Sequence, residues 1–170
     1  MTIGIHLAAF LFLFGCKPKG DSSFLVARYN EKTSDYAYYD QQGEKVLGGY
    51  YAVYTDTIRT YGIVADSVFA LIDKSGKHIY NIFPFDNGPD PTSEGIYRIR
   101  KNGKIGYADS ASSRVLIEPK FGCAFPFENG KAKVAYDCQE KPASDTPGEE
   151  HKVWVSNSWF YVDKTGKKID

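Results

Sequence analysis

The side chains best suited to chemistry are few in this chain of 170 residues. Glu149, Glu150 and His151 stand together and offer oxygen and nitrogen ligands of the kind that bind divalent metals. No second set of ligands follows at a helical or hairpin spacing, so we interpret the trio as part of a solvated acidic loop and predict no metal and no cofactor. The Gly-x-Ser-x-Gly, phosphate-loop and His-Glu-x-x-His motifs do not occur. The sequence therefore predicts a protein that is not an enzyme.

An apolar run at the N-terminus stops abruptly at a cysteine. Residues 3–15 are too few to cross a bilayer but have the length of the apolar region of a secretory signal. The segment Leu13 to Cys16 resembles the lipobox of bacterial lipoproteins: leucine, a variable residue, a small residue, then cysteine. This resemblance implies a signal peptide over 1–15, acylation of the Cys16 thiol and a tether over 16–23. It places the protein on the bacterial cell envelope, in the outer membrane where there are two membranes. The alternative is an uncleaved apolar N-terminus with a chance cysteine.

The two other cysteines remain as an even pair if Cys16 carries lipid. An exported protein enters an oxidising compartment, where cysteine pairs form disulfides. We therefore predict a bridge between Cys123 and Cys138, closing a loop over the stretch AFPFENGKAKVAYD. The alternative is two separate thiols in the core, because free cysteine is often buried.

The composition favours strands and excludes one class of partner. Aromatic residues make up 15% of the chain, and such side chains pack well on a pleated sheet. The 16 glycines suit a chain with many turns. The 21 basic and 21 acidic residues cancel, so the chain lacks the basic surface of a nucleic-acid-binding protein.

Four segments share one pattern: an aromatic or apolar run reaches aspartate, then a turn, then a second β-prone run. They are YAYYDQQGEKVL, FALIDKSGKHIY, IGYADSASSRVLI and WFYVDKTGKKID. Their turn residues are Asp40 with Gly43, Asp73 with Gly76, Asp109, and Asp163 with Gly166. The aspartate can accept hydrogen bonds from the next amides, and the glycine can adopt positive φ. We predict structural roles for all four aspartates, with a different turn after Asp109, which no glycine follows.

A further hairpin precedes each aspartate. In GIYRIRKNGKIGYAD two β-prone runs flank Asn102-Gly103, a strong signal for a two-residue hairpin turn. Proline and aromatic residues link the units, in FPFDNGPDPTSEG and FPFENG.

This arrangement resembles the WG-repeat family, and the third unit carries the best match. There Gly106-Tyr107-Ala108-Asp109, Pro119, Phe121, Pro126-Phe127 and Gly130 fall in register with the family pattern. The family's tryptophan falls on Tyr36, Phe69, Ile105 and Trp159 in the four units, and no unit keeps the Trp-Gly pair. The resemblance implies a β-rich repeat protein that acts as an interaction module.

We therefore predict an all-β repeat protein of stacked antiparallel hairpins, forming an elongated or curved sheet assembly. Single hairpins cannot bury an apolar face alone, so neighbouring units must stack. One domain over 24–170 would hold four units, at about 24–61, 62–94, 95–129 and 130–170.

The last unit carries an insertion, which is either a tolerated surface loop or the recognition element. Glu149, Glu150 and His151 lie just before Trp154 and Trp159, so charge meets large aromatic side chains of a kind enriched in interfaces. We expect a non-enzymatic, lipid-anchored interaction or scaffold module of the envelope, whose partner is an envelope protein. The alternative is a carbohydrate-binding envelope protein that uses exposed aromatic rings to hold a glycan.

Overall fold

The computed structural model describes residues 23–143 and 152–169, and the regular structure among them consists of strands without a helix. The strands are β1 Leu25–Asn30, β2 Asp35–Tyr39, β3 Lys45–Tyr50, β4 Ala52–Val53, β5 Thr57–Ile58, β6 Tyr61–Ala65, β7 Phe69–Asp73, β8 His78–Ile82, β9 Pro84–Phe85, β10 Gly88–Pro89, β11 Ile96–Lys101, β12 Lys104–Asp109, β13 Val115–Phe121, β14 Cys123–Ala124, β15 Lys131–Ala135, β16 Gln139–Pro142, β17 Lys152–Val155, β18 Phe160–Asp163 and β19 Lys168–Ile169. No helix in this described part of the chain is long and apolar enough to cross a membrane.

All named strand pairs are antiparallel, and the prediction of an all-β protein is confirmed. The larger sheets have the strand orders β3-β2-β1-β5, β13-β12-β11-β8-β7-β6-β4 and β14-β15-β18-β19, and β9–β10 and β16–β17 form two-stranded sheets. The seven-stranded sheet joins strands from several of the expected units, because β4 pairs with β6 and β8 pairs with β11.

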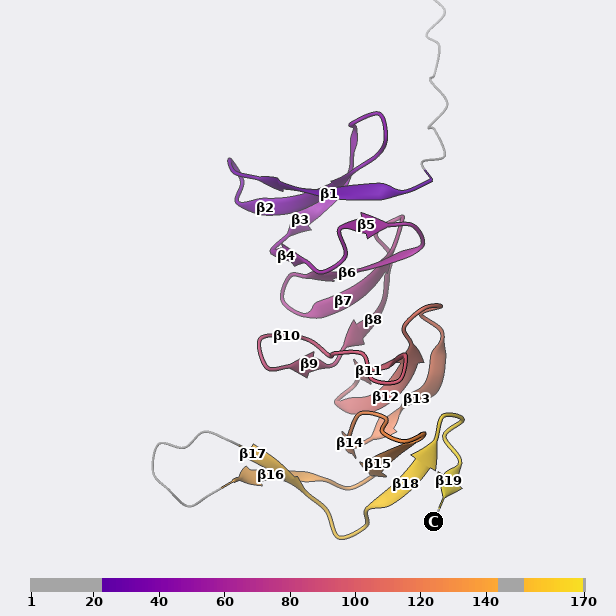
Figure 1. Cartoon of the computed structure of the whole chain (residues 1–170). Coiled ribbons are helices and arrows are strands. Elements are labelled where there is room, and N and C mark those ends of the chain that lie inside the picture. The colour runs from indigo at the N-terminus through magenta and orange to yellow at the C-terminus, as the bar shows by residue number, and fades with distance from the viewer. Residues whose placement is uncertain (1–22, 144–151, 170) are drawn as a thin grey trace, which may run out of the picture.

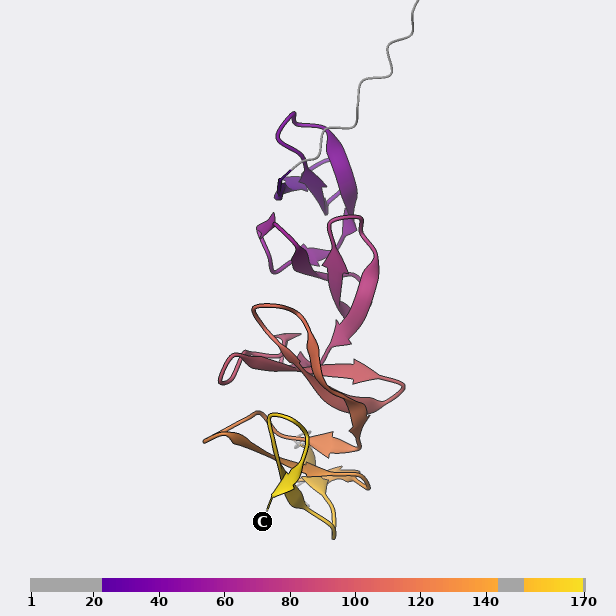
Figure 2. The same cartoon turned by 90° about the vertical axis from the view of Figure 1, so that its right-hand side faces the viewer.

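The molecule is a column whose sheets follow one another in chain order. Figure 1 shows β1 to β3 at one end and β18 and β19 at the other, and the column keeps its length in the view of Figure 2. The β16–β17 hairpin projects sideways from the column near the C-terminal end (Figure 1).

Among the described residues, the buried side chains form three core clusters instead of one. The first lies between the N-terminal sheet and β6–β7, the second between β7–β8 and β11–β12, and the third between β11–β13 and the C-terminal sheet. Strand β7 shows how they connect: Ala70 and Ile72 belong to the first cluster and Leu71, between them, to the second. Successive side chains of a strand point to opposite faces, so one strand serves two cores.

Three aspartate turns share one set of hydrogen bonds. In the second, Asp73 Oδ1 accepts the amide hydrogens of Ser75 at 2.8 Å and Lys77 at 3.0 Å, and Gly76 adopts φ 81°. The turns after Asp40 and Asp163 repeat these bonds at the equivalent positions. The turn after Asp109 is one residue longer, and Ser113 takes the positive-φ position there. These carboxylates are thus occupied in closing hairpins.

Candidate functional site

A groove lined by aromatic rings lies between the column and the projecting hairpin. Its volume is about 370 Å³, and its lining consists of Phe83, Phe85, Arg98, Phe125, Pro126, Lys152, Val153 and Trp154. We call this the aromatic groove. Phe85 and Phe125 are 54% and 40% exposed, so two rings of its lining are open to a ligand.

Three separate segments position these rings. Phe83 follows β8, and its amide donates to the carbonyl of Arg98 at 2.9 Å. Phe125 follows β14, and its amide donates to the carbonyl of Lys133 at 2.9 Å. Trp154 comes from β17 of the hairpin. Phe83 and Phe125 each begin a Phe-Pro-Phe sequence in a linker between the expected units. Two sides of the groove therefore come from linkers, and the third comes from the insertion.

The rings meet edge to face. Trp154 lies 5.9 Å from Phe83 and 5.4 Å from Phe125 between ring centroids, with interplanar angles of 74° in both pairs. Trp159 also contacts Phe125, with ring centroids 5.6 Å apart and a tilted interplanar angle of 50°. Edge-to-face pairs of this kind add about 0.5–1.5 kcal/mol each beyond the area they bury. Phe125 therefore holds both tryptophans of the chain at one place.

A buried ion pair between Asp90 and Arg98 lies against the aromatic groove. Asp90 and Arg98 are 6% and 3% exposed, and the Asp90 carboxylate accepts hydrogen bonds from the Arg98 backbone amide, Nε and Nη2. Arg98 Nη1 donates to the Ala124 carbonyl at 3.1 Å, and the guanidinium carbon lies 4.2 Å from the Phe83 ring centroid. The charge is thus neutralised inside the protein, and each of the three guanidinium nitrogens donates to a protein acceptor. The groove is left with a mainly apolar lining, in which Lys152 is the other charged residue.

The β16–β17 hairpin is attached to the column mainly at its base and at one ring. The residues of its two strands are exposed except for Trp154, which is half-buried against the phenylalanines. At the base, the sulfur atoms of Cys138 and Cys123 lie at disulfide distance, with Cα atoms 5.7 Å apart. An isolated hairpin is marginally stable in water, so the cysteine pair and the ring contacts determine the position of Trp154 beside the groove.

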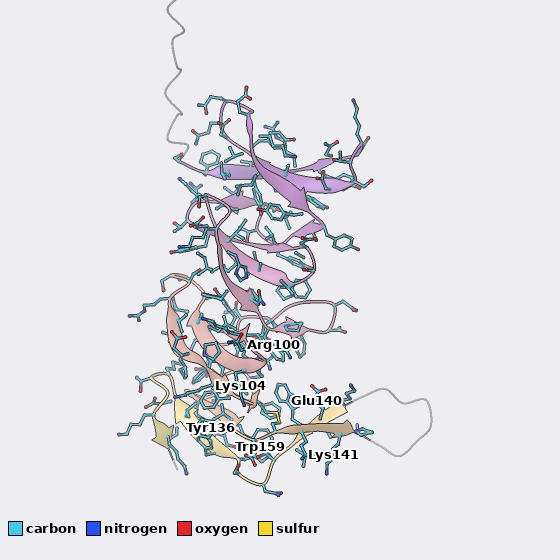
Figure 3. All side chains as sticks on the ribbon, turned by 180° about the vertical axis from the view of Figure 1, so that it is seen from behind. Arg100, Lys104, Tyr136, Glu140, Lys141 and Trp159 are labelled. Carbon is cyan, nitrogen blue, oxygen red and sulfur yellow. A yellow bond between two sulfur atoms is a disulfide. The ribbon has the colours of Figure 1, made fainter. Side chains whose placement is uncertain are left out.

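Two serines reinforce the same base. Ser158 and Ser156 donate hydrogen bonds to Asp137, and the bond from Ser158 is the main cause that lowers the pKa of the Asp137 carboxyl. Figure 3 shows Glu140 and Lys141 on the hairpin, with Trp159 and Tyr136 on the column beside its root.

The candidate residues from the sequence have different outcomes. Trp154 and Trp159 are brought together around Phe125, whereas Cys16, Glu149, Glu150 and His151 lie outside the described residues. The four turn aspartates are spread along the column and do not converge. Hydroxyl groups of Ser75, Ser112 and Thr165 hydrogen-bond to three of them and lower the pKa of Asp73, Asp109 and Asp163.

Within residues 23–143 and 152–169, no group of three or more His, Cys, Asp and Glu side chains is placed to hold a metal ion. The chain matches no protein-family model, no curated protein and no solved structure. The groove must therefore be interpreted from its own chemistry.

Sequence reasoning did not identify Phe83, Phe85, Phe125, Asp90 or Arg98 as parts of a site. The repeated Phe-Pro-Phe predicts only a linker between units. The recurrence is the signal that Phe83 and Phe125 have similar positions, since each follows a strand and donates its amide to the carbonyl of a neighbouring strand.

Proposed function

We propose that this protein is a non-catalytic, lipid-anchored interaction module of a bacterial cell envelope, and that it binds a protein partner in the aromatic groove. The observation that carries the proposal is the groove itself. Exposed rings from two linkers and the half-buried Trp154 of an inserted hairpin converge on one cavity, and aromatic side chains are enriched where interfaces concentrate binding energy.

The proposal includes a scaffold of four WG-like units. Support comes from the shared hydrogen-bond pattern of the turns at Asp40, Asp73 and Asp163, which lie at equivalent positions of the expected units. Gly106 adds to it: an added Cβ would stand 2.4 Å from the Ile117 carbonyl oxygen, so the close approach of β12 and β13 needs a glycine at the family's glycine position.

The groove is tested by capture from detergent-solubilised envelopes. We expect the wild-type protein to retain a partner that Phe85→Ala loses, because the Phe85 ring is more than half exposed and lies outside the buried core clusters. The circular dichroism spectrum of Phe85→Ala should match that of the wild type. Tyr51→Ala is the matched control, since Tyr51 is 77% exposed and lies between β3 and β4, two strands toward the N-terminal end of the column (Figure 1). Retention of every partner by Phe85→Ala would contradict the proposal.

The anchor is tested separately at Cys16. The wild-type chain should partition into membranes and carry an acyl mass, and Cys16→Ala should remain unprocessed and lose the lipid. Several acyl chains give a stable anchor, whereas one gives only reversible binding. Unchanged processing and unchanged membrane retention in Cys16→Ala would refute this part of the proposal.

A further inference from the structure

The outer face of the C-terminal sheet carries a cationic surface beside the aromatic groove. In β15, Ala132 and Val134 are buried in the core, so Lys131 and Lys133 point to the opposite face. Lys133 pairs in register with Tyr161 of β18, which is 38% exposed on this same face.

This surface is hollowed and continuous with the groove. A cavity of about 310 Å³ is lined by Phe125, Pro126, Lys131, Lys133 and Tyr161, together with Glu128 and Asn129. Phe125 and Pro126 line the aromatic groove as well. We call the second cavity the lysine hollow. A ligand that fills the groove and continues past Phe125 enters it.

The two lysines are held on ring faces and are not neutralised by an ion pair. Lys131 Nζ lies 4.7 Å from the Tyr161 ring centroid, and Lys133 Nζ lies 4.9 Å from that of Trp159. Among the described residues neither has a carboxylate within ion-pair distance, unlike Lys152 with Glu140 and Lys164 with Glu94. The hollow therefore presents two ammonium groups, with Glu128 as the acidic side chain of its lining.

The groove suits an apolar side chain better than a sugar. Its one buried polar group, the Arg98 guanidinium, already donates to Asp90 and Ala124. The rest of the lining is aromatic or aliphatic apart from Lys152, which already pairs with Glu140. Most sugar hydroxyls that enter the groove therefore lose their water without gaining a partner, which costs free energy, whereas an aliphatic side chain gains from the same burial. In addition, Lys131 and Lys133 each lie over one face of the Tyr161 and Trp159 rings, so that face is not open for stacking on a sugar.

We propose that the aromatic groove and the lysine hollow together bind an extended acidic peptide segment of a protein partner. A bulky apolar side chain of the segment occupies the groove, and neighbouring Asp or Glu side chains pair with Lys131 and Lys133. This inference rests on the proposed function, because it requires the groove to be the recognition site, and it adds the chemical class of the ligand.

The test uses the two tryptophans of the chain, Trp154 and Trp159, as fluorescent reporters, since both contact Phe125. The probe is a synthetic octapeptide with a Pro-Leu centre and glutamates on both sides; matched peptides carry glutamine or lysine instead. We expect the glutamate peptide to bind roughly tenfold more tightly than the glutamine peptide, from two exposed ion pairs. The difference should shrink between about 0.05 M and about 0.5 M NaCl, because salt screens exposed charges.

Charge reversal provides the matched variants. Lys131→Glu combined with Lys133→Glu should abolish the preference for the glutamate peptide and favour the lysine peptide. Lys32→Glu combined with Lys101→Glu makes the same change in net charge away from the hollow and should keep the wild-type preference.

Two results would overturn the inference. One is equal binding of the three peptides by the wild-type protein, and the other is tighter binding of polygalacturonate than of any peptide, which would identify an acidic glycan as the ligand. If either occurs while Phe85→Ala still loses its envelope partner, the peptide assignment fails and the groove remains the recognition site. If Phe85→Ala keeps its partner, the proposed function fails as well.

Discussion

The buried pair of Asp90 and Arg98 gives a sharp prediction for Asp90→Asn. The asparagine has nearly the same shape but carries no charge, and it offers one acceptor oxygen instead of two. The guanidinium stays buried, with Arg98 3% exposed, so it cannot recover its lost partner from water. The Ala124 carbonyl and the Phe83 ring remain in contact with it but do not neutralise it.

The magnitude follows from the burial of both partners. Breaking a buried ion pair by removing one charge costs about 3–5 kcal/mol. Asparagine keeps part of the hydrogen bonding, so we expect the lower end, about 3 kcal/mol of unfolding free energy. For a chain of this length each kcal/mol lowers Tm by about 2–4 °C, so the expected loss is about 9 °C.

The measurement is urea unfolding and thermal melting of the wild-type protein and the variant, followed by circular dichroism. Glu140→Gln is the control, because its ion pair with Lys152 is exposed on both sides, and it should change the free energy of unfolding by about 0.5 kcal/mol or less. The double variant Asp90→Leu with Arg98→Met should recover part of the loss, since it leaves no unpaired charge in the core but removes the partners of the Arg98 amide and the Ala124 carbonyl. The reasoning is refuted if Asp90→Asn costs no more than Glu140→Gln.

Three further predictions concern packing, the cysteines and pH. Gly106→Ala should cost about 3 kcal/mol in urea unfolding, because its Cβ meets β13 backbone, whereas Gly88→Ala, which has open space, should be nearly neutral. Replacing Cys123 and Cys138 by serine should lower the free energy of unfolding by about 3 kcal/mol, and peptide mapping without reduction should recover the two cysteines cross-linked. Hydrogen bonds from Ser75 and Thr165 hold the pKa of Asp73 and Asp163 below 3.8, so their contribution to stability is complete above pH 3.8 and is lost as pH falls through the lower folded pKa. Asp73→Asn with Asp163→Asn should therefore show a smaller fall in Tm between about pH 5 and about pH 2.

Each of these has a result that contradicts it. Equal stability of Gly106→Ala and Gly88→Ala would mean that the approach of β12 to β13 is not tight. Two alkylatable thiols in freshly purified, oxidised protein would exclude the disulfide. If Tm of the double asparagine variant falls between about pH 5 and about pH 2 as much as that of the wild type, the turn carboxylates do not determine the loss of stability in acid.

The features that sequence could predict are those formed by residues close together in the chain. The bonds that Asp73 accepts come from Ser75 and Lys77, so the turn is encoded within five positions. The two-residue turn at Asn102 and Gly103 is equally local, and both residues adopt positive φ as such a turn requires.

The groove could not be predicted in the same way, because its walls are distant in sequence. Phe83 and Trp154 meet only after the strands between them have paired, and no local pattern specifies that contact. Asp90 stands among prolines and glycine in a stretch typical of a turn, and only the β9–β10 pairing brings its carboxylate to Arg98.

The insertion lies between these two cases. Strand β17 is a β-prone run of four residues in which only Trp154 is half-buried. A run this short, inside a polar insertion, does not predict a strand by itself. The structure forms a hairpin there because Gln139–Pro142 supplies a partner strand across the insertion. The prediction that Trp154 and Trp159 belong to one site depended on their closeness in sequence and said nothing of Phe125.

The division of the core into three clusters means that the two ends of the column can open independently. Exposing the backbone amides of β1 and β2 requires breaking only the first cluster, and the free energy for this is smaller than that of global unfolding. The last cluster contains more buried side chains, and the cysteine pair lies beside it. Amide hydrogen exchange should therefore be fast in the N-terminal sheet and slow in β15 and β18. Local unfolding of the N-terminal sheet therefore leaves the third cluster folded. Proteolysis in the opened N-terminal sheet should accordingly leave the aromatic groove assembled.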